Sequence, residues 1–254
     1  MPMLDREGVK IYYEVHGSGP VILLSHGYTA TSQMWRGQID ALTRRHTLVV
    51  WDMRGHGRSD SPADPSAYSA ASTIADMAAL LDAVGAQRAV VGGLSLGGYY
   101  SLMFHLKHPQ RVSALLILST GPGFRKDEAR EAWNREAYGR AARFEAEGMQ
   151  RVLALDERLT GGTHRCVEGL AGAARGMLAQ QDGSVMESLP TIRVPALIVV
   201  GADDKPFLQA AEVMAAKIPG ASKVVIPGAG HSVNVDQPRA FDDAVCAFLD
   251  THSL

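Results

Sequence analysis

Short apolar runs alternate with longer segments of helical pattern along most of the chain. The runs with strand-like composition are residues 9–16, 21–25, 47–51, 88–92, 112–118, 194–200 and 223–226. The segments with a helical pattern lie near residues 34–44, 70–84, 96–108, 207–218 and 238–251. Such alternation is typical of strands joined by helical crossovers. The pattern therefore predicts an α/β fold, with a mainly parallel sheet and helices on both of its faces.

The alternation stops between residues 122 and 189. This stretch has a helical pattern without a strand-like run, and its first part is rich in Arg, Glu and Ala. It is too long for an ordinary connection between a strand and a helix, so it predicts a helical cap inserted into the sheet domain. We expect a core domain formed by residues 1–121 and 190–254, with the cap formed by residues 122–189.

Composition narrows the classes of partner. Of the 254 residues, 46% are hydrophobic and 20% are charged, and the formal net charge is −2. These values are normal for a globular protein with a core. Because basic residues form no runs, nothing indicates nucleic acid or an anionic membrane as a partner. The apolar runs are of strand length, well short of the roughly 20 residues that cross a bilayer.

The N-terminus and the two cysteines favour a cytoplasmic protein. Asp5 and Glu7 stand where a secretory signal would have its apolar stretch. Cys166 and Cys246 are far apart in the sequence and lack Cys-x-x-Cys spacing. We therefore expect two reduced structural cysteines rather than a disulfide or a catalytic thiol.

The clearest chemical motif is Gly93-x-Ser95-x-Gly97, placed between a predicted strand and a predicted helix. A serine there takes a strained conformation on a tight turn, where side chains at the flanking glycines would collide with neighbouring elements. The turn raises Ser95 Oγ above the sheet edge and leaves the backbone N–H of Leu96 at a helix N-terminus, where an oxyanion can be stabilised. A P-loop would need Lys followed by Ser or Thr after the last glycine, and a dinucleotide fingerprint would need Gly-x-Gly. The sequence has neither.

Five segments, in the same order, resemble motifs of the α/β-hydrolase family. They are Ser25-His26-Gly27-Tyr28, Asp52-Met53-Arg54-Gly55-His56-Gly57-Arg58-Ser59, the serine motif, Val199-Val200-Gly201-Ala202-Asp203-Asp204 and Gly228-Ala229-Gly230-His231. The resemblance covers nearly the whole chain and is weakest in the cap. It implies an α/β-hydrolase fold with a mostly parallel eight-stranded sheet and a helical cap, and it implies a catalytic triad of Ser95, Asp204 and His231.

A serine hydroxyl becomes a nucleophile when a positioned imidazole can accept its proton. Of the nine histidines, His231 follows a glycine-rich loop after a strand, from which it can reach over the sheet. His105 and His108 share one helix, and we expect them on a solvated helix face rather than at a metal site, since no third ligand is apparent. We expect His56 to brace its glycine turn and His26 to anchor its loop.

The imidazole needs a carboxylate on its second nitrogen. Asp203 and Asp204 both follow a strand, and the family's Gly-x-x-Asp spacing from Gly201 selects Asp204, which leaves Asp203 as a turn residue. The oxyanion hole is expected to use the backbone N–H groups of Leu96 and Tyr28. The phenol of Tyr28 either contacts substrate or packs in the pocket wall.

The expected reaction is hydrolysis of a small to medium carboxylic ester through an acyl-enzyme. The resemblance leaves open an enol-lactone hydrolase or a carbon–carbon bond hydrolase of aromatic catabolism, and also a non-catalytic member that only binds a small ligand. Dehalogenases and epoxide hydrolases of this fold carry Asp at the position of Ser95, which argues against both. The expected partner is a small-molecule ester or lactone, with no metal and no organic cofactor.

Overall fold

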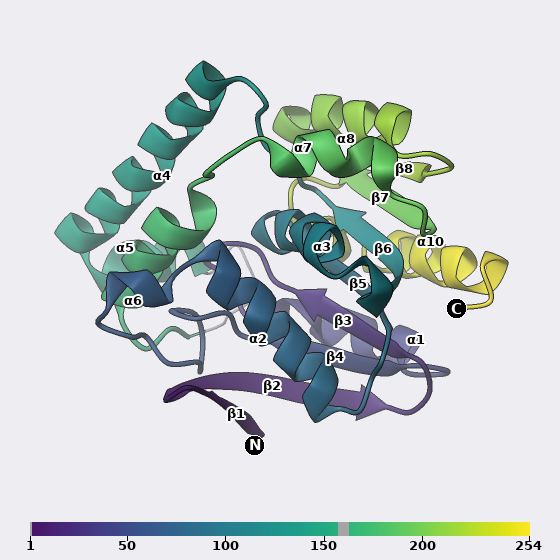
Figure 1. The fold of residues 1–254 in the computed structure, drawn as a ribbon, viewed down its shortest axis with the longest axis horizontal. Coiled ribbons are helices and arrows are strands. Elements are labelled where there is room, and N and C mark those ends of the chain that lie inside the picture. The colour runs from purple at the N-terminus through teal and green to yellow at the C-terminus, as the bar shows by residue number, and fades with distance from the viewer. Residues whose placement is uncertain (1, 157–162) are drawn as a thin grey trace.

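The computed structural model describes residues 2–156 and 163–254, and its centre is an eight-stranded sheet (Figure 1). The strand order is β1-β2-β4-β3-β5-β6-β7-β8, with antiparallel pairing of β2 to β1 and to β4 and parallel pairing elsewhere. The predicted α/β-hydrolase fold with a mostly parallel sheet is confirmed. The strands are β1 Met3–Arg6, β2 Val9–Gly17, β3 Val21–Ser25, β4 Thr47–Trp51, β5 Ala89–Leu94, β6 Val112–Leu118, β7 Ala196–Gly201 and β8 Ser222–Ile226.

Helices cover both faces of the sheet because successive apolar residues of its strands point to opposite sides. In β3, Leu23 packs on one face, while Ile22 and Leu24 pack on the other. The face of Leu23 is covered by α2, α3 and α8, and the opposite face by α1, α9 and α10. These helices are α1 Ile39–Leu42, α2 Ala70–Ala83, α3 Leu96–Lys107, α8 Lys205–Lys217, α9 Val233–Asp236 and α10 Pro238–Thr251.

Two local features differ from the sequence pattern. The sequence pattern does not predict strand β1. This strand has only four residues of mixed polarity and lies at the sheet edge, partly exposed along its length. The helix expected at 34–44 is a 3₁₀ helix, η1 Ser32–Gln38, followed by α1. The Thr31 side chain accepts a hydrogen bond from the backbone of Gln33 and so starts η1 early.

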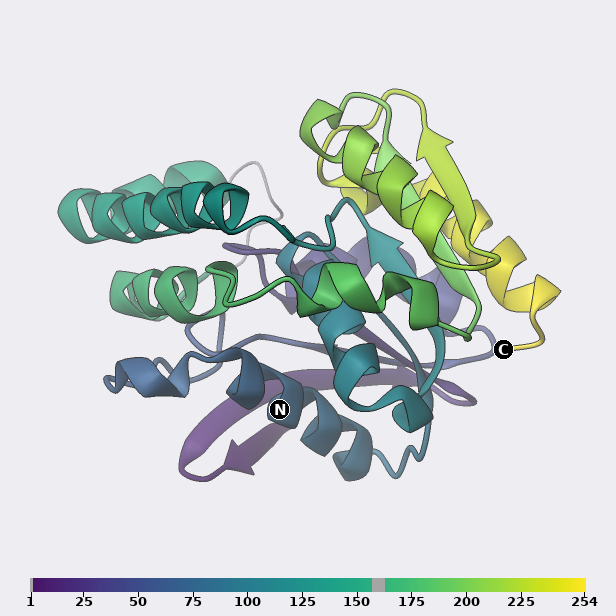
Figure 2. The ribbon, with the colours of Figure 1, turned by 45° about the horizontal axis from the view of Figure 1, so that its top comes forward.

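The regular elements described between β6 and β7 are all helical. They are α4 Asp127–Glu147, α5 Met149–Asp156, α6 Val167–Ala173, a π-helical turn η4 Ala174–Leu178, α7 Ser184–Ser188 and the 3₁₀ turn η5 Leu189–Thr191. Helices α4, α5 and α6 lie together at one side of the molecule, away from α10 (Figures 1 and 2). The exact cap boundaries stay a prediction. No helix in the described parts of the chain is both long enough and apolar enough to span a bilayer.

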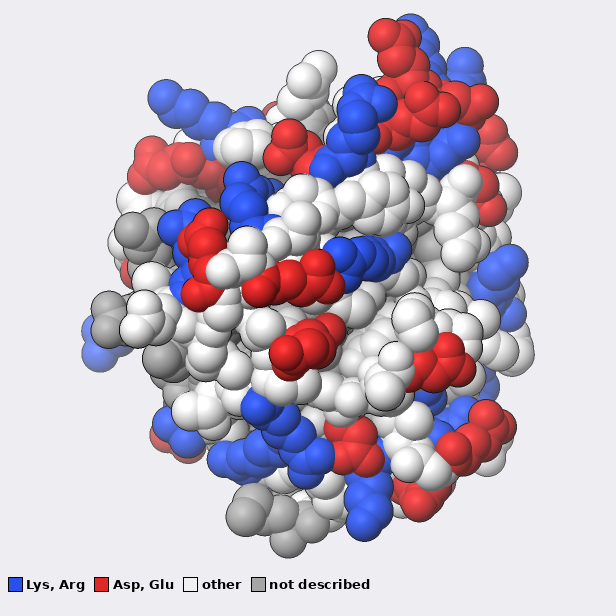
Figure 3. All heavy atoms as spheres, turned by 90° about the vertical axis from the view of Figure 1, so that its left-hand side faces the viewer, with Lys and Arg blue, Asp and Glu red and all other residues white. Residues whose placement is uncertain are grey.

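Charges of both signs are interspersed over the side of the molecule that carries the cap (Figure 3). Several form ion pairs, such as Arg175 with Glu145 and Arg130 with Asp127. Helix α4 accordingly buries only a narrow stripe, formed by Ala137, Ala141 and Phe144.

Glycines bring the cap backbone into direct contact with the loop after β4. A Cβ atom on Gly176 would lie 1.6 Å from the carbonyl oxygen of Tyr68, and one on Gly172 would lie 2.7 Å from the Tyr68 ring. A Cβ atom on Gly169 would lie 2.9 Å from Gly55 Cα. Glycine is required where backbones approach this closely, so α6 and η4 are packed firmly onto the core.

His26 joins the loops that follow β3 and β4. Its Nε2 atom accepts a hydrogen bond from the backbone N–H of Met53 at 2.9 Å, so its proton is on Nδ1, which donates to Gly27 O at 2.7 Å. Burial lowers the pKa of His26 to about 4. His56 packs against His26 with ring centroids 4.9 Å apart and bonds through Nδ1 to Arg54 O. The two histidines therefore anchor their loops as neutral side chains.

The close approach at Gly176 predicts that Gly176→Ala destabilises the protein by about 2 kcal/mol or more, since the backbone must shift to admit the new atom. Gly139→Ala is the matched control, because Gly139 is in α4 with no atom within 4 Å of a Cβ placed there. That change should stabilise by about 0.5–1 kcal/mol. Urea unfolding of both variants measures the difference, and equal stabilities would contradict the close docking of η4.

The depressed pKa of His26 predicts a loss of stability in acid. The unfolded chain binds a proton near pH 6.5 and the folded chain only near pH 4, so the contribution of neutral His26 is complete above pH 6.5 and is lost as the pH falls toward 4. Between pH 7 and pH 5 this amounts to about 2 kcal/mol. Urea unfolding at both pH values should show a smaller pH dependence in His26→Asn than in the wild type; identical dependences would refute this origin.

Candidate active site

Ser95 lies between β5 and α3 in a backbone conformation that non-glycine residues rarely adopt, with φ 55° and ψ −114°. Three hydrogen bonds fix it. The Ser95 N–H donates to Leu118 O in β6 at 2.9 Å, and Ser95 O accepts from Thr120 Oγ1 at 2.6 Å and from the Tyr99 N–H at 3.0 Å. The surrounding structure therefore imposes the strained conformation.

The glycines around Ser95 stand at positions where neighbouring atoms leave no space for a side chain. A Cβ atom on Gly93 would lie 2.5 Å from the carbonyl carbon of Gly97, and one on Gly97 would lie 2.2 Å from Ser25 O at the end of β3. A Cβ atom on Gly98 would lie 2.6 Å from Thr120 Cγ2. The tight turn predicted from the sequence thus depends on contact between the start of α3 and the ends of two other segments.

Asp204 and His231 come together from the loops after β7 and β8. Asp204 Oδ2 lies 2.9 Å from His231 Nδ1, and the Asp204 side chain is only 4% exposed. The approach is possible because Gly201 has no side chain; its Cβ would lie 2.3 Å from Ala229 O. Asp203 is exposed, and its backbone N–H donates to Ala229 O. The structure thus pairs the imidazole with Asp204 and places Asp203 in the loop.

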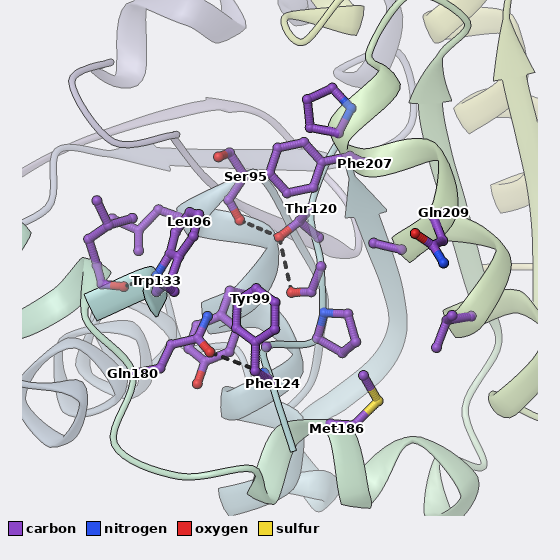
Figure 4. Close-up of a pocket in the computed structure, with 17 residues that line it drawn as sticks. Ser95, Leu96, Tyr99, Thr120, Phe124, Trp133, Gln180, Met186, Phe207 and Gln209 are labelled. Carbon is purple, nitrogen blue, oxygen red and sulfur yellow. Dashed lines mark hydrogen bonds between the residues drawn. The ribbon is translucent and has the colours of Figure 1, made fainter. Parts of the chain in front are cut away.

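Phe207 connects this pair to Ser95. Its ring stacks on the His231 ring with centroids 5.0 Å apart and an angle of 26° between the planes. Phe207 also lines the pocket that contains Ser95, and Figure 4 shows the two side chains at the same end of that pocket. The His231 ring therefore packs against a side chain of the pocket wall, although His231 is not itself among the described lining residues.

Two backbone segments lie beside Ser95: the loop after β3 and the first turn of α3. Leu96 is the first residue of α3, so its N–H has no acceptor within the helix. A Cβ atom on Gly27 would lie 3.5 Å from Ser95 Cβ, which places the Gly27-Tyr28 segment against the elbow. The phenol of Tyr28 donates to Leu170 O in α6 at 2.9 Å. The hydroxyl therefore joins the core to the cap.

The expectation for His105 is wrong. The His105 side chain, on α3, is buried rather than solvated, and burial lowers its pKa. His108 packs against Phe104, with ring centroids 5.2 Å apart. Within residues 2–156 and 163–254 no group of three His, Cys, Asp or Glu side chains is arranged to hold a metal ion. Cys166 and Cys246 form no disulfide.

The pocket of Ser95 has a volume of about 560 Å³ and lies between the sheet, the cap and α8 (Figure 4). Tyr99, Phe124, Trp133 and Phe207 supply aromatic walls. None of the described residues that line it is Asp, Glu, Lys, Arg or His. Of these lining residues, the motifs in the sequence predict Ser95 and Leu96 but none of those in the cap, because a helical pattern does not indicate which helix face meets a distant loop.

Comparisons with known proteins agree with this fold. The family described as "alpha/beta hydrolase fold" matches residues 20–168. A protein of Azorhizobium caulinodans, provisionally named carbamate hydrolase RutD, is 32% identical, with 98% of each chain covered. The enol-lactonase of Burkholderia xenovorans LB400 has a TM-score of 0.80 at 26% identity, covering 98% of this chain and 100% of its own. A thermophilic esterase from Thermogutta terrifontis has a TM-score of 0.80 at 28% identity, covering 98% and 97%. The chain belongs to the α/β-hydrolase family.

Proposed function

We propose that this hydrolase cleaves neutral, largely apolar carboxylic esters through an acyl-enzyme, with Ser95 as nucleophile, His231 as base and Asp204 as the acid that orients it. The observation that carries the proposal is the position of Ser95. It stands on a strained turn in the wall of a pocket without charged lining residues, and Phe207 in that wall stacks on the imidazole of the hydrogen-bonded Asp204–His231 pair.

The hydrogen bond from His231 Nδ1 to Asp204 leaves Nε2 as the proton acceptor. In the proposed reaction Ser95 Oγ attacks the ester carbonyl carbon while Nε2 takes the hydroxyl proton. The N–H groups of Leu96 and Tyr28 stabilise the negative oxygen of the tetrahedral intermediate. The intermediate collapses, and the alcohol leaves with the proton from His231.

The second half of the reaction returns the serine. Nε2 of His231 takes a proton from water, and the hydroxide formed attacks the acyl carbon. The carboxylic acid is released as Ser95 Oγ regains the proton. Asp204 remains ionised throughout, and because it is buried beside the imidazole it stabilises the imidazolium that forms in both steps.

The pocket favours one substrate class over others. Carbamate, the substrate in the name of the Azorhizobium relative, is a small anion, whereas this pocket offers a large apolar volume with no cationic side chain among its described residues. Lactones are the second candidate. A lactone is a cyclic ester cleaved by the same two steps, and the similarity to the enol-lactonase favours it.

A non-catalytic binding protein would gain nothing from the strain at Ser95. A residue held in such a conformation costs about 1–3 kcal/mol, and strained residues of this kind cluster at sites where the strain serves a mechanism. The strained turn therefore supports catalysis rather than binding alone.

The role of Ser95 predicts covalent labelling by a fluorophosphonate probe. Ser95→Ala should remove labelling and lower the rate of p-nitrophenyl butyrate hydrolysis by about 10⁴-fold or more. Mass spectrometry of the labelled peptide and initial rates provide the measurements. Labelling that persists elsewhere in Ser95→Ala would show that another residue is the nucleophile.

We expect substitutions of the two adjacent carboxylates, Asp204 and Asp203, to differ widely in their effects on the rate. Asp204→Asn keeps the shape of the side chain but leaves the imidazole in the wrong tautomer, so kcat/KM should fall by roughly 10⁴-fold. Asp203→Asn is the matched control. It changes an exposed residue next to Asp204. Because the reacting groups stay in place, kcat/KM should fall by less than about tenfold. Circular dichroism establishes that both variants are folded, and a dead Asp203→Asn with an active Asp204→Asn would exchange the two assignments.

A further inference from the structure

We propose that Gln180 selects substrates whose apolar group carries a neutral oxygen acceptor, such as a ketone or ether oxygen, at a distance from the scissile ester. The inference rests on the proposed function and narrows its substrate class. It depends on three observations: the fixed orientation of the Gln180 amide, the anchoring of its backbone and the lack of a charged side chain among the described residues that line the pocket.

The orientation of the amide follows from its partner. Gln180 Oε1 lies 3.2 Å from the backbone nitrogen of Phe124. Because a backbone N–H can only donate, the oxygen of the amide faces Phe124 and the NH₂ group points the other way. Gly123 makes room for this contact. A Cβ atom there would lie 2.7 Å from Oε1, and the residue has φ +79°.

The backbone of Gln180 is anchored by α4. Asn134 Nδ2 donates to Gln180 O at 2.8 Å, and the Gln180 N–H donates to Asn134 Oδ1 at 2.7 Å. Trp133 Nε1 donates to Leu178 O at 2.8 Å. These bonds hold the segment that follows the π-helical turn, so the amide is positioned before substrate arrives.

The two N–H groups of Gln180 Nε2 have no acceptor among the described residues. Gln180 is half-buried and lines the pocket, where Figure 4 shows its amide beside Tyr99 and Trp133. The Thr120 hydroxyl is already committed to Ser95 O. Gln209 also lines the pocket, but from the exposed side of α8. Gln180 thus presents a fixed neutral donor in an apolar wall.

A donor of this kind favours a neutral acceptor over a carboxylate. An ionised carboxylate would lose its hydration here without meeting a positive side chain among the described lining residues. A ketone oxygen loses less hydration and gains the hydrogen bond. An alkyl chain in the same place would leave the amide donors without a partner, and such a loss is what makes polar sites discriminate.

The test compares methyl hexanoate, methyl 5-oxohexanoate and monomethyl hexanedioate, with hexyl acetate and 5-oxohexyl acetate for the case in which the pocket takes the alcohol part. Rates are measured at pH 8 by titrating the acid released. Gln180→Glu is the decisive variant, because the carboxylate still accepts from Phe124 but, being ionised at pH 8, cannot donate. Gln209→Glu is the matched control, with the same change of charge on the same pocket.

We expect wild type to prefer the oxo ester over its alkyl counterpart by about tenfold in kcat/KM in one of the two series, as one hydrogen bond can provide. Gln180→Glu should bring the ratio of kcat/KM between the oxo and alkyl esters close to one, and Gln209→Glu should retain the preference. No preference in either series, a preference unchanged in Gln180→Glu, or a preference for the hexanedioate ester would overturn the inference.

Binding separates this inference from the proposed function. In Ser95→Ala, the dissociation constants of the oxo and alkyl esters are read from tryptophan fluorescence, since Trp133 lines the pocket. If wild type hydrolyses none of the esters, the proposed function fails, and the ratio of the dissociation constants still decides the role of Gln180. A ratio near one would overturn it, and a ratio of about ten that Gln180→Glu removes would support it.

Discussion

The conformation of Ser95 is the constraint on which the rest of the site depends. A backbone with φ 55° at a non-glycine residue persists only when its neighbours hold it. Here β6 supplies a carbonyl acceptor, the segment after β6 supplies the Thr120 hydroxyl, and α3 begins so close to β3 that Gly97 can carry no side chain. The conformation of Ser95 therefore depends on the register of the central strands, which links the stability of the sheet to the geometry of the proposed nucleophile.

The parallel strands explain why residues far apart in sequence meet. Strands β3, β5, β7 and β8 end at the same edge of the sheet, and the loops after them carry the Gly27-Tyr28 segment, Ser95, Asp204 and His231. This edge is where open α/β sheets place their ligand sites. Since each group arrives on a separate loop, small glycine contacts such as that of Gly201 with Ala229 set the final distances.

The features that the sequence predicted are those controlled by local rules. The elbow has a steric requirement that shows as glycines at fixed spacing. The resemblance to the family's Gly-x-x-Asp pattern singled out Asp204, which the structure pairs with His231. The burial of His105 and the partners of Gln180 could not be predicted in this way. They depend on which helix face meets a distant segment, and the helical pattern of the cap, with its narrow buried stripe, leaves that choice open.

One segment of the chain contacts both Ser95 and Gln180. In the segment from Leu118 to Phe124, Leu118 O and Thr120 Oγ1 hold Ser95, and the N–H of Phe124 holds the Gln180 amide. Under the proposed roles, the cap can thus place substrate against Ser95 without contacting it. A change in the cap that leaves this segment intact can alter which group fills the pocket while the strained turn stays as it is. In the proposed function, core residues then determine the chemistry, and cap residues determine which substrates reach it.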